Sequence, residues 1–332
     1  MRYTVDSLHH RVTGAYPKPC SFDPEQPLEP QKSRIREVYT ELLKMPQTRH
    51  PGSPQIEYRK EDHPEYDEIR FTVETEPNFF VPAHMLLPKH RRSGEKLPTV
   101  ICLQGHSTGM HISLGRKKYP KDDCGGDRDF ALQAVRKGYI AVTVEQRGLG
   151  ELKSGIDCNF MCHQLAFECL MSGRTLQGER IHDMMCMVDV LACFDEVDMG
   201  RIAIMGHSGG GTTAYHTAVL DDRIRVCMPS GSFCTYEDSI LSMVHCACNF
   251  VPGISTQMEM PDLAMLIAPR PLILVNGDRD PIFPLAAANR AYETVQQIYK
   301  AAGAPENCHH VIGNGEHRFF AADAWPVFDQ YI

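Results

Sequence analysis

"IMGHSGGGTTAYH", residues 204–216, decides the fold, because it places a serine between glycines after an apolar run and before a stretch of small residues. The pentapeptide 206–210 fits the pattern G-x-S-x-G, in which the serine occupies a strained turn from a strand to a helix and exposes its hydroxyl above a sheet. Flanking glycines permit the close approach and strained dihedral angles of such a turn, which a plain helix N-cap does not need. The motif predicts that Ser208 is a nucleophile, and a glycine-rich turn with a helix cap is the alternative.

Short apolar runs alternate with helix-like segments on both sides of this motif. The runs are rich in β-branched residues and end in polar or glycine turns: TVICLQ (99–104), YIAVTVE (139–145), RIAIMG (201–206), IRVCMPSG (224–231) and PLILVNG (271–277). The helix-like segments are 127–137, 175–196, 209–219 and 285–302. This alternation predicts an α/β fold with a mostly parallel sheet, helices on both faces and right-handed crossovers.

The N-terminal part of the chain has a different character. Residues 1–65 are rich in proline and charge and contain one predicted amphipathic helix, KSRIREVYTELLKM (32–45). We interpret them as an N-terminal extension packed on the main domain. The next two segments, YDEIRFTVET (66–75) and NFFVPAHMLLP (78–88), predict a pair of antiparallel strands.

The main domain is predicted to span residues 66–332 with one insertion. Residues 233–262 fall between two predicted strands and have a mixed content of cysteine, methionine and proline. We expect this insertion to form a small cap over the site. The oligomeric state stays open, because the N-terminal extension packs either on its own domain or on a second copy in a homo-oligomer.

Composition excludes several classes of function. The 332 residues are 42% hydrophobic and 23% charged, and the net charge of −8 gives no electrostatic footprint for nucleic acid. The N-terminus lacks the apolar core of a signal peptide, and no stretch approaches the ~18 apolar residues of a membrane span. These features predict a cytoplasmic protein that binds neither nucleic acid nor membranes.

The 13 cysteines are scattered among apolar residues, as reduced core thiols are. The closest groupings of possible metal ligands are Cys158 with Cys162, and His245 with Cys246 and Cys248. A zinc site needs more ligands at suitable spacing, and Cys-x-Cys within an apolar run is poor for a tetrahedral site. We therefore expect buried thiols, with neither a metal nor another cofactor.

Chemically useful residues follow several of the predicted strands. Ligands and catalytic groups gather at the carboxyl ends of strands in such a sheet. Ser208 follows one run, Asp278 and Asp280 follow another, His317 follows HHVI, and the glycine turn QGHSTG (104–109) follows VICL. A serine hydroxyl needs a base, and the imidazole needs a carboxylate that holds its tautomer. The order serine, aspartate, histidine supplies each part.

From about Tyr66 to Ile332 the chain resembles the α/β-hydrolase superfamily, in particular the branch with acetyl xylan esterases, dienelactone hydrolase-like proteins and family-7 abhydrolases. The resemblance rests on the segments LQGHSTGM, VEQRGLGE, IMGHSGGG, LIAPRPLILVNGDRDPIFP and GNGEHRFF. It implies that Ser208 is the nucleophile, His317 the general base and then acid, and Asp280 the orienting carboxylate.

The same resemblance implies an oxyanion hole. One donor would be the N–H of Gly209, which follows the nucleophile, and the other an N–H in the turn of Gly105 and His106, which we assign to His106. The loop departs from many relatives, because it reads Gln-Gly-His where they have His-Gly-x. Asp278 is interpreted as a turn former, since relatives place the acid just before the proline that follows Asp280.

Other polar residues near these motifs have structural interpretations. His207 is expected to pack beneath the serine turn, and Arg147 in QRGLG to brace a loop rather than bind substrate. Arg180 and Asp183 are expected to form a pair on a helix surface. Glu145 is expected to be structural or solvated.

The expected function is hydrolysis of a carboxylic ester, with a small acyl (acetyl) ester of a sugar or another polar alcohol as the substrate. An acyl-serine intermediate and no cofactor are implied. The alternatives are a peptidase like prolyl oligopeptidases and a catalytically inactive hydrolase fold that serves as a binding module. The expected short acyl group rests on a narrow apolar slot beside Ser208, which the insertion would wall with Met243, Val244, Phe250, Val251 and Met258.

Overall fold

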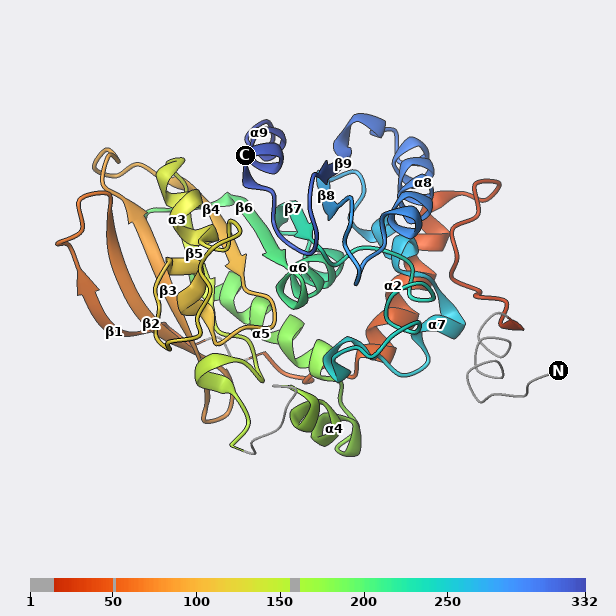
Figure 1. Ribbon diagram of the computed structural model, residues 1–332, viewed down its shortest axis with the longest axis horizontal. Helices are drawn as coiled ribbons and strands as arrows, with labels where there is room; N and C mark the ends of the chain where they lie inside the picture. Colours follow the sequence, from red (N-terminus) through yellow and green to blue (C-terminus); the bar gives the residue numbers. More distant parts are fainter. Residues whose placement is uncertain (1–14, 50–51, 156–161) are drawn as a thin grey trace.

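The computed structural model describes residues 15–49, 52–155 and 162–332, and these form one nine-stranded sheet covered by helices (Figure 1). In spatial order the strands are β1 (Gln55–Lys60), β2 (Tyr66–Glu76), β3 (Phe79–Pro88), β5 (Ile140–Val144), β4 (Leu97–Leu103), β6 (Val197–His207), β7 (Ile224–Ser230), β8 (Leu272–Gly277) and β9 (Cys308–Gly313). The first three pair antiparallel, as does β3 with β5, and every later pair is parallel. The predicted mostly parallel sheet is confirmed.

Two hydrophobic layers explain why the central strands are continuous apolar runs. Successive side chains of a strand point to opposite faces, and helices cover both faces here. In β4, Ile101 and Leu103 pack in the layer that contains residues of α2 (Leu28–Leu43), α5 (Leu176–Leu191), α6 (Gly209–Leu220) and α8 (Leu285–Ala301). Val100 and Cys102 pack in the opposite layer with α3 (Phe130–Arg136) and α9 (Ala321–Phe328).

The four helix-like segments of the sequence correspond to α3, α5, α6 and α8. The described elements that the sequence did not predict include β1, α4 (His163–Met171) and α9. Strand β1 pairs with β2, so the sheet begins before residue 66. Figure 1 shows β1, β2 and β3 at one end of the sheet and β8 and β9 toward the other.

The N-terminal segment packs against the insertion that follows β7. Helix α2 buries one face, and the backbone N–H of Cys20 donates to the carbonyl of Gln257 at 2.9 Å. Lys18 and Glu259 form an ion pair at 2.7 Å. The insertion itself contains short helical turns: η3 (Ala247–Asn249), α7 (Ile254–Gln257) and η4 (Met260–Leu266). In this structure, residues 15–49 therefore pack against the insertion of the same chain.

Candidate active site

The turn that carries Ser208 joins β6 to α6 and is strained. Ser208 has φ 53° and ψ −124°, a backbone conformation that side-chain-bearing residues rarely adopt, and its N–H donates to the Ser230 carbonyl at 2.7 Å. A Cβ on Gly210 would collide with the carbonyl oxygens of Leu103 and Gln104. Glycine at this position therefore lets α6 begin directly against the end of β4, which aims the serine above the sheet.

Asp280 and His317 are brought together from the ends of neighbouring strands. Asp280 follows β8 and His317 follows β9, and His317 Nδ1 lies 2.8 Å from Asp280 Oδ2. The other carboxylate oxygen accepts the backbone N–H groups of Ile282 and Phe283 at 2.8 and 3.1 Å. Burial is the largest single influence and would raise the pKa of Asp280, but the hydrogen bond and electrostatic attraction to His317, together with the backbone N–H groups of Phe283 and Ile282, hold that pKa below the usual range. The carboxylate is thus kept charged beside the imidazole.

Asp278 occupies a different position from Asp280. Its side chain is exposed, and its Oδ1 accepts the N–H of Gly315 at 2.8 Å, so it closes the turn between the two loops. Of the two carboxylates, Asp278 and Asp280, the one that bonds to the imidazole of His317 is Asp280.

The imidazole of His317 lies against the turn of Ser208. Its ring centroid is 4.7 Å from that of His207, and a Cβ on Gly231 would lie 3.1 Å from its Cε1. Within the described residues, His317 Nε2 is buried without a hydrogen-bond partner, and no hydrogen bond joins it to the Ser208 hydroxyl. Such bonds are often long before substrate binds. His207 is buried beneath the turn, as predicted, and its Nδ1 is 3.1 Å from Ser230 Oγ.

The loop after β4 packs directly on the serine turn. A Cβ on Gly105 would lie 2.9 Å from the carbonyl oxygen of His207 and 3.0 Å from Ser208 Cβ. The ring of His106 covers Gly209, where an added Cβ would lie 2.8 Å from His106 Cε1. Gly209 opens α6, and the first N–H groups of a helix have no acceptor within that helix. The two predicted donor residues therefore lie on adjacent turns beside Ser208.

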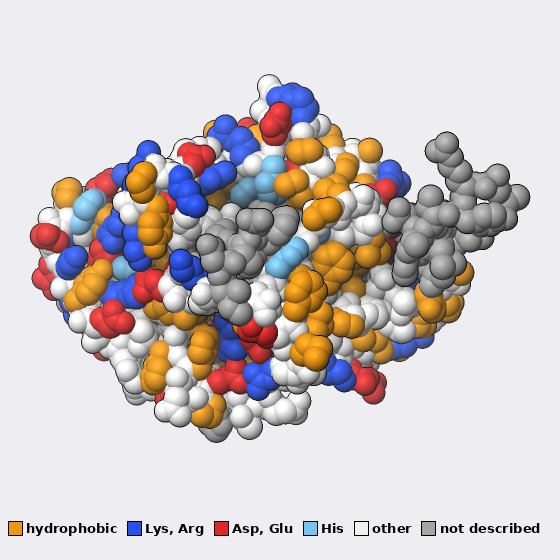
Figure 2. Space-filling model, turned by 60° about the horizontal axis from the view of Figure 1, so that its bottom comes forward, with side chains coloured by type: hydrophobic (Ala, Val, Ile, Leu, Met, Phe, Trp, Pro, Cys, Tyr) orange, Lys and Arg blue, Asp and Glu red, His pale blue; other side chains and the backbone are white. Residues whose placement is uncertain are grey.

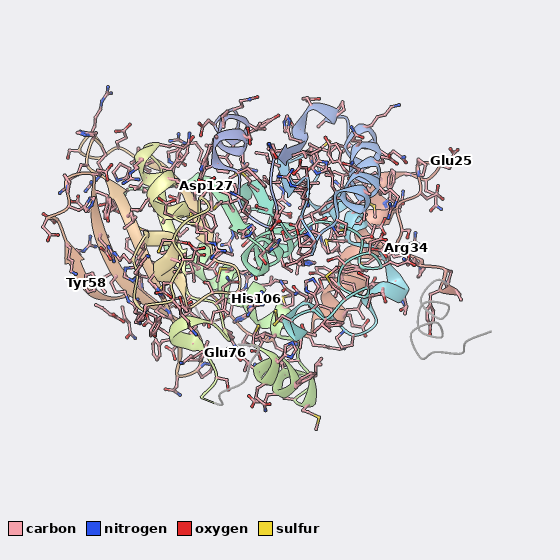
Figure 3. The ribbon with its side chains drawn as sticks, in the orientation of Figure 1. Glu25, Arg34, Tyr58, Glu76, His106 and Asp127 are labelled. Carbon is pink, nitrogen blue, oxygen red and sulfur yellow. The ribbon has the colours of Figure 1, made fainter. Side chains whose placement is uncertain are left out.

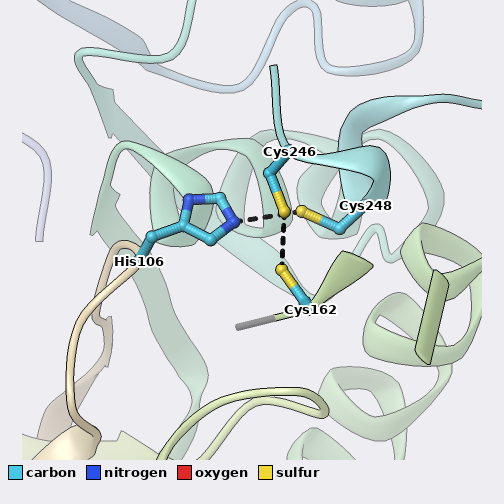
Figure 4. Close-up of side chains that lie close together, drawn as sticks. All are labelled: His106, Cys162, Cys246 and Cys248. Carbon is cyan, nitrogen blue, oxygen red and sulfur yellow. Dashed lines mark hydrogen bonds between the residues drawn. The ribbon is translucent and has the colours of Figure 1, made fainter. Parts of the chain in front are cut away.

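The side chain of His106 points into a cluster of cysteines. His106 Nε2 is 3.1 Å from Cys248 Sγ, and the Sγ atoms of Cys162 and Cys246 are 2.7 Å apart. All four ligand atoms lie within 4.8 Å of one another (Figure 4). We expected buried thiols because a zinc site needs more ligands at suitable spacing than the sequence shows. That reason was wrong, since the fold supplies His106 and Cys162 from two distant segments.

His245, grouped with these cysteines in the sequence, is not part of the cluster. Its Nδ1 lies 3.0 Å from the side-chain nitrogen of Asn249, and burial lowers the pKa of His245 to about 4, helped by nearby His106 and His317. Cys158 lies outside the described residues. Figure 3 shows His106 near the middle of the molecule, far from Tyr58 on β1.

Arg147 braces the loop after β5, as predicted. Its guanidinium donates two hydrogen bonds of 2.7 Å to Asp183 and further bonds to Glu179 at 2.9 Å and Glu76 at 2.7 Å. The prediction of a surface pair on the helix was wrong: Arg180 and Asp183 are each only 1% exposed. Arg180 instead donates to the carbonyl of Arg147 at 2.7 and 3.0 Å.

The insertion does not form the predicted five-residue wall. Val244 is 83% exposed and Phe250 38% exposed, whereas Met258 is fully buried in the main hydrophobic core. These side chains therefore cannot line one slot together.

In Figure 2, hydrophobic side chains gather beside histidines near the middle of one face. Among the described residues, every helix is too short or too polar to span a bilayer.

The sheet order, the strained serine between β6 and α6, and the strand ends that carry Asp280 and His317 define an α/β-hydrolase fold. The chain belongs to the abhydrolase family, whose model matches residues 5–323. The family is one of hydrolases with esterase-like members, and carbohydrate esterases are among the chains of similar structure.

Individual relatives are distant in sequence. YtaP of Bacillus subtilis (strain 168), a protein that carries a hydrolase name, is 25% identical over 73% of this chain and 79% of its own length. A Bacteroides fragilis NCTC 9343 protein that carries the name acetyl xylan esterase matches with a TM-score of 0.79 and 18% identity, over 100% of this chain and 90% of that one. A glucuronoyl esterase from Solibacter usitatus matches with a TM-score of 0.68 and 14% identity, over 95% of both chains.

Proposed function

We propose that the protein is a serine hydrolase that cleaves carboxylic esters through an acyl-serine intermediate. The observation that carries this proposal is the strained Ser208 turn beside an imidazole whose Nδ1 is held by Asp280 and whose Nε2 is buried and unpartnered among the described residues. A buried polar atom without a partner is costly, and at this position a serine hydroxyl or a reacting oxygen would satisfy it.

In the first half of the reaction, His317 Nε2 takes the proton of the Ser208 hydroxyl while Ser208 Oγ attacks the carbonyl carbon of the ester. Asp280 accepts the Nδ1–H hydrogen bond, which fixes the tautomer and stabilises the imidazolium. The imidazolium then returns the proton to the leaving alcohol, and the acyl group stays on Ser208.

In the second half, a water molecule replaces the alcohol. His317 takes its proton, the hydroxyl attacks the acyl carbon, and the carboxylic acid leaves as Ser208 regains its proton. In this proposal, the N–H groups of Gly209 and His106 stabilise the oxyanion of both tetrahedral intermediates. This stabilisation is usually among the largest single contributions to the rate.

We propose a short acyl ester, such as an acetyl ester of a sugar or another polar alcohol, as the substrate. The names of the carbohydrate esterases among the similar structures support the alcohol side, although their sequence identities of 14–18% show likeness of fold alone. The predicted apolar slot no longer supports the acyl side, because its residues do not share a wall. A cytoplasmic location and a homo-oligomer stay predictions.

The test is a series of nitrophenyl esters with acyl chains from two to twelve carbons, measured beside a peptide anilide. We expect the highest kcat/KM at two or three carbons and negligible cleavage of the anilide. The Ser208→Ala variant, checked for folding by circular dichroism, measures the background. A maximum at eight or more carbons would contradict the short-acyl substrate. Efficient cleavage of the anilide would favour the peptidase alternative. A protein that hydrolyses no ester at all would favour the inactive binding module.

A further inference from the structure

The cysteine cluster beside the active site unites three segments of the chain. His106 follows β4, Cys162 precedes α4, and Cys246 and Cys248 lie at η3 in the insertion after β7. Figure 4 shows their side chains converging on one point, with the sulfur atoms and His106 Nε2 facing one another. Cys162 and Cys248 are buried. An ordinary apolar core does not need three thiols and an imidazole turned toward a common centre.

The donors match one class of ligand. Three cysteine sulfurs and one histidine nitrogen form a common tetrahedral zinc set, with Zn–S bonds of about 2.3 Å and Zn–N bonds of about 2.0–2.1 Å. Around such an ion the sulfur atoms would be separated by about 3.8 Å. The distances here bracket that value, from 2.7 Å between the Sγ atoms of Cys162 and Cys246 to at most 4.8 Å across the cluster. Shifts of about 1 Å complete the tetrahedron.

A buried arginine beside the cluster is the second, independent observation. The guanidinium of Arg180 is near enough to Cys162, Cys246 and Cys248 to interact with them electrostatically, and the residue is 1% exposed. Its guanidinium donates to the Arg147 carbonyl, and none of the ion pairs among the described residues includes it. A buried charge needs a counter-charge. Three thiolates around a divalent zinc ion carry one net negative charge, which Arg180 balances.

We propose that His106, Cys162, Cys246 and Cys248 form a structural zinc site that ties the loop after β4 to α4 and to the insertion after β7. Four protein ligands close the coordination sphere, so the ion has no open position for substrate. It fixes the ring of His106 against Gly209. On binding, each coordinating thiol releases its proton to solvent, and the sulfur and nitrogen lone pairs form the four bonds.

The first experiment measures metal in the unaltered chain. The protein is purified without a chelator and without a histidine tag, and its zinc is quantified by mass spectrometry with thiol titration. We expect about one zinc per chain, and a thiolate-to-metal charge-transfer band after replacement by Co²⁺. A chain without zinc that takes up neither Zn²⁺ nor Co²⁺ would overturn the site, as would a disulfide between Cys162 and Cys246 in protein purified under reducing conditions.

Variants then test the ligand set. Cys162→Ser and Cys248→Ser are expected to lose most of the zinc, and His106→Ala to bind it more weakly. Cys227→Ser is the matched control, since Cys227 is also buried but donates to the carbonyl of Ala214 in another part of the core. Equal zinc in Cys248→Ser and Cys227→Ser would contradict the assignment. The zinc content of the unaltered chain is measured first. That measurement therefore tests the zinc site even if one of the variants fails to fold.

The consequence for catalysis rests on the proposed function, because it concerns the loop that would hold an oxyanion donor. Removal of zinc by a strong chelator should lower kcat by on the order of tenfold to a hundredfold, with recovery when zinc is returned. Loss of zinc without loss of kcat would overturn this positioning role. Absence of esterase activity before zinc is removed would count against the proposed function, whereas the metal content would still decide the site.

Discussion

At the scale of single residues, the backbone of Ser208 is a strained feature of the proposed site. A residue with a side chain held at positive φ costs on the order of 1–3 kcal/mol and persists only where its surroundings impose it. Here the N–H of Ser208 bonds to Ser230, and Gly210 packs tightly on the end of β4. In the proposed mechanism, this strained turn presents the hydroxyl of Ser208 to the ester carbonyl.

Substitution of the three proposed catalytic residues should separate their roles. Ser208→Ala and His317→Ala are each expected to lower kcat by roughly 10⁴-fold or more, and Asp280→Ala somewhat less, because the imidazole keeps part of its function without the carboxylate. The matched control is Asp278→Ala, which removes an exposed turn carboxylate from the same loop. Steady-state kinetics on an acetyl ester measures the effects. A larger loss for Asp278→Ala than for Asp280→Ala would show that the acid is misassigned.

Glu145 gives a prediction about pH. Its side chain is buried, and burial raises its pKa to about 7, although the backbone N–H groups of Glu151 and Met110 donate to it. Between its ordinary pKa and 7 the folded state binds the proton more tightly than the unfolded state. The stabilising contribution is therefore complete at acid pH and is lost as the pH rises through 7.

Thermal or urea unfolding at pH 5.5 and pH 8 measures this contribution. Glu145 should account for a loss of on the order of 2 kcal/mol in the free energy of unfolding between these two values. In Glu145→Gln, which cannot ionise, the fall in stability over the same interval should be smaller by about this amount. Equal pH dependence in both proteins would show that the carboxyl of Glu145 is already ionised at pH 5.5.

At the scale of secondary-structure elements, the Arg147 network joins the loop after β5 to β2 and α5. The guanidinium bonds to Glu76 at the end of β2 and to Glu179 and Asp183 on α5, and it lies 4.3 Å from the ring centre of Phe79. Removal of one partner from a buried ionic network leaves the others uncompensated.

Arg147→Met is therefore expected to lower the free energy of unfolding by about 3–5 kcal/mol, measured by urea denaturation. Arg201→Met is the control, because Arg201 pairs with Asp198 at an exposed position and should change stability by at most about 1 kcal/mol. A loss for Arg147→Met no larger than that of the control would contradict a bracing role.

The elements that the sequence predicted are those with a strong periodic signal. Central strands are apolar where helices cover both of their faces, as in residues 202–205 of β6 and residues 272–275 of β8. Strand β1 carries QIEYRK and is exposed along nearly its whole length, so no hydrophobic pattern marks it. It is defined by its pairing with β2, which a single segment of sequence does not reveal.

The three proposed catalytic residues could be located from the sequence, whereas the cysteine cluster could not. Ser208, Asp280 and His317 each follow an apolar run, so the rule about carboxyl ends of parallel strands locates all three. The cysteine cluster follows no such rule, because Cys162 and Cys246 are 84 positions apart and Cys248 and His106 are 142 positions apart. In the sequence, only the neighbouring pair of Cys246 and Cys248 pointed to this cluster. The fold brings His106 and Cys162 to that pair.

At the scale of the whole molecule, the site lies where three parts of the chain meet. The sheet supplies the strand ends, the loop after β4 covers the serine turn, and the insertion after β7 carries two of the clustered cysteines. The N-terminal segment holds that insertion from outside, because Lys18 pairs with Glu259 and the N–H of Phe22 donates to Asp262 at 2.8 Å. At this meeting point we propose that Ser208 is an activated nucleophile.

Labelling with a fluorophosphonate probe tests this claim most directly, because only an activated hydroxyl beside an oxyanion hole reacts readily. Peptide mapping by mass spectrometry identifies the labelled residue, with Ser208→Ala as the negative control and Ser242→Ala as a control that keeps the site intact. The account predicts a single label on Ser208, and ester hydrolysis that falls in proportion to labelling. A label on another serine, or an active protein that takes up no label, would contradict it.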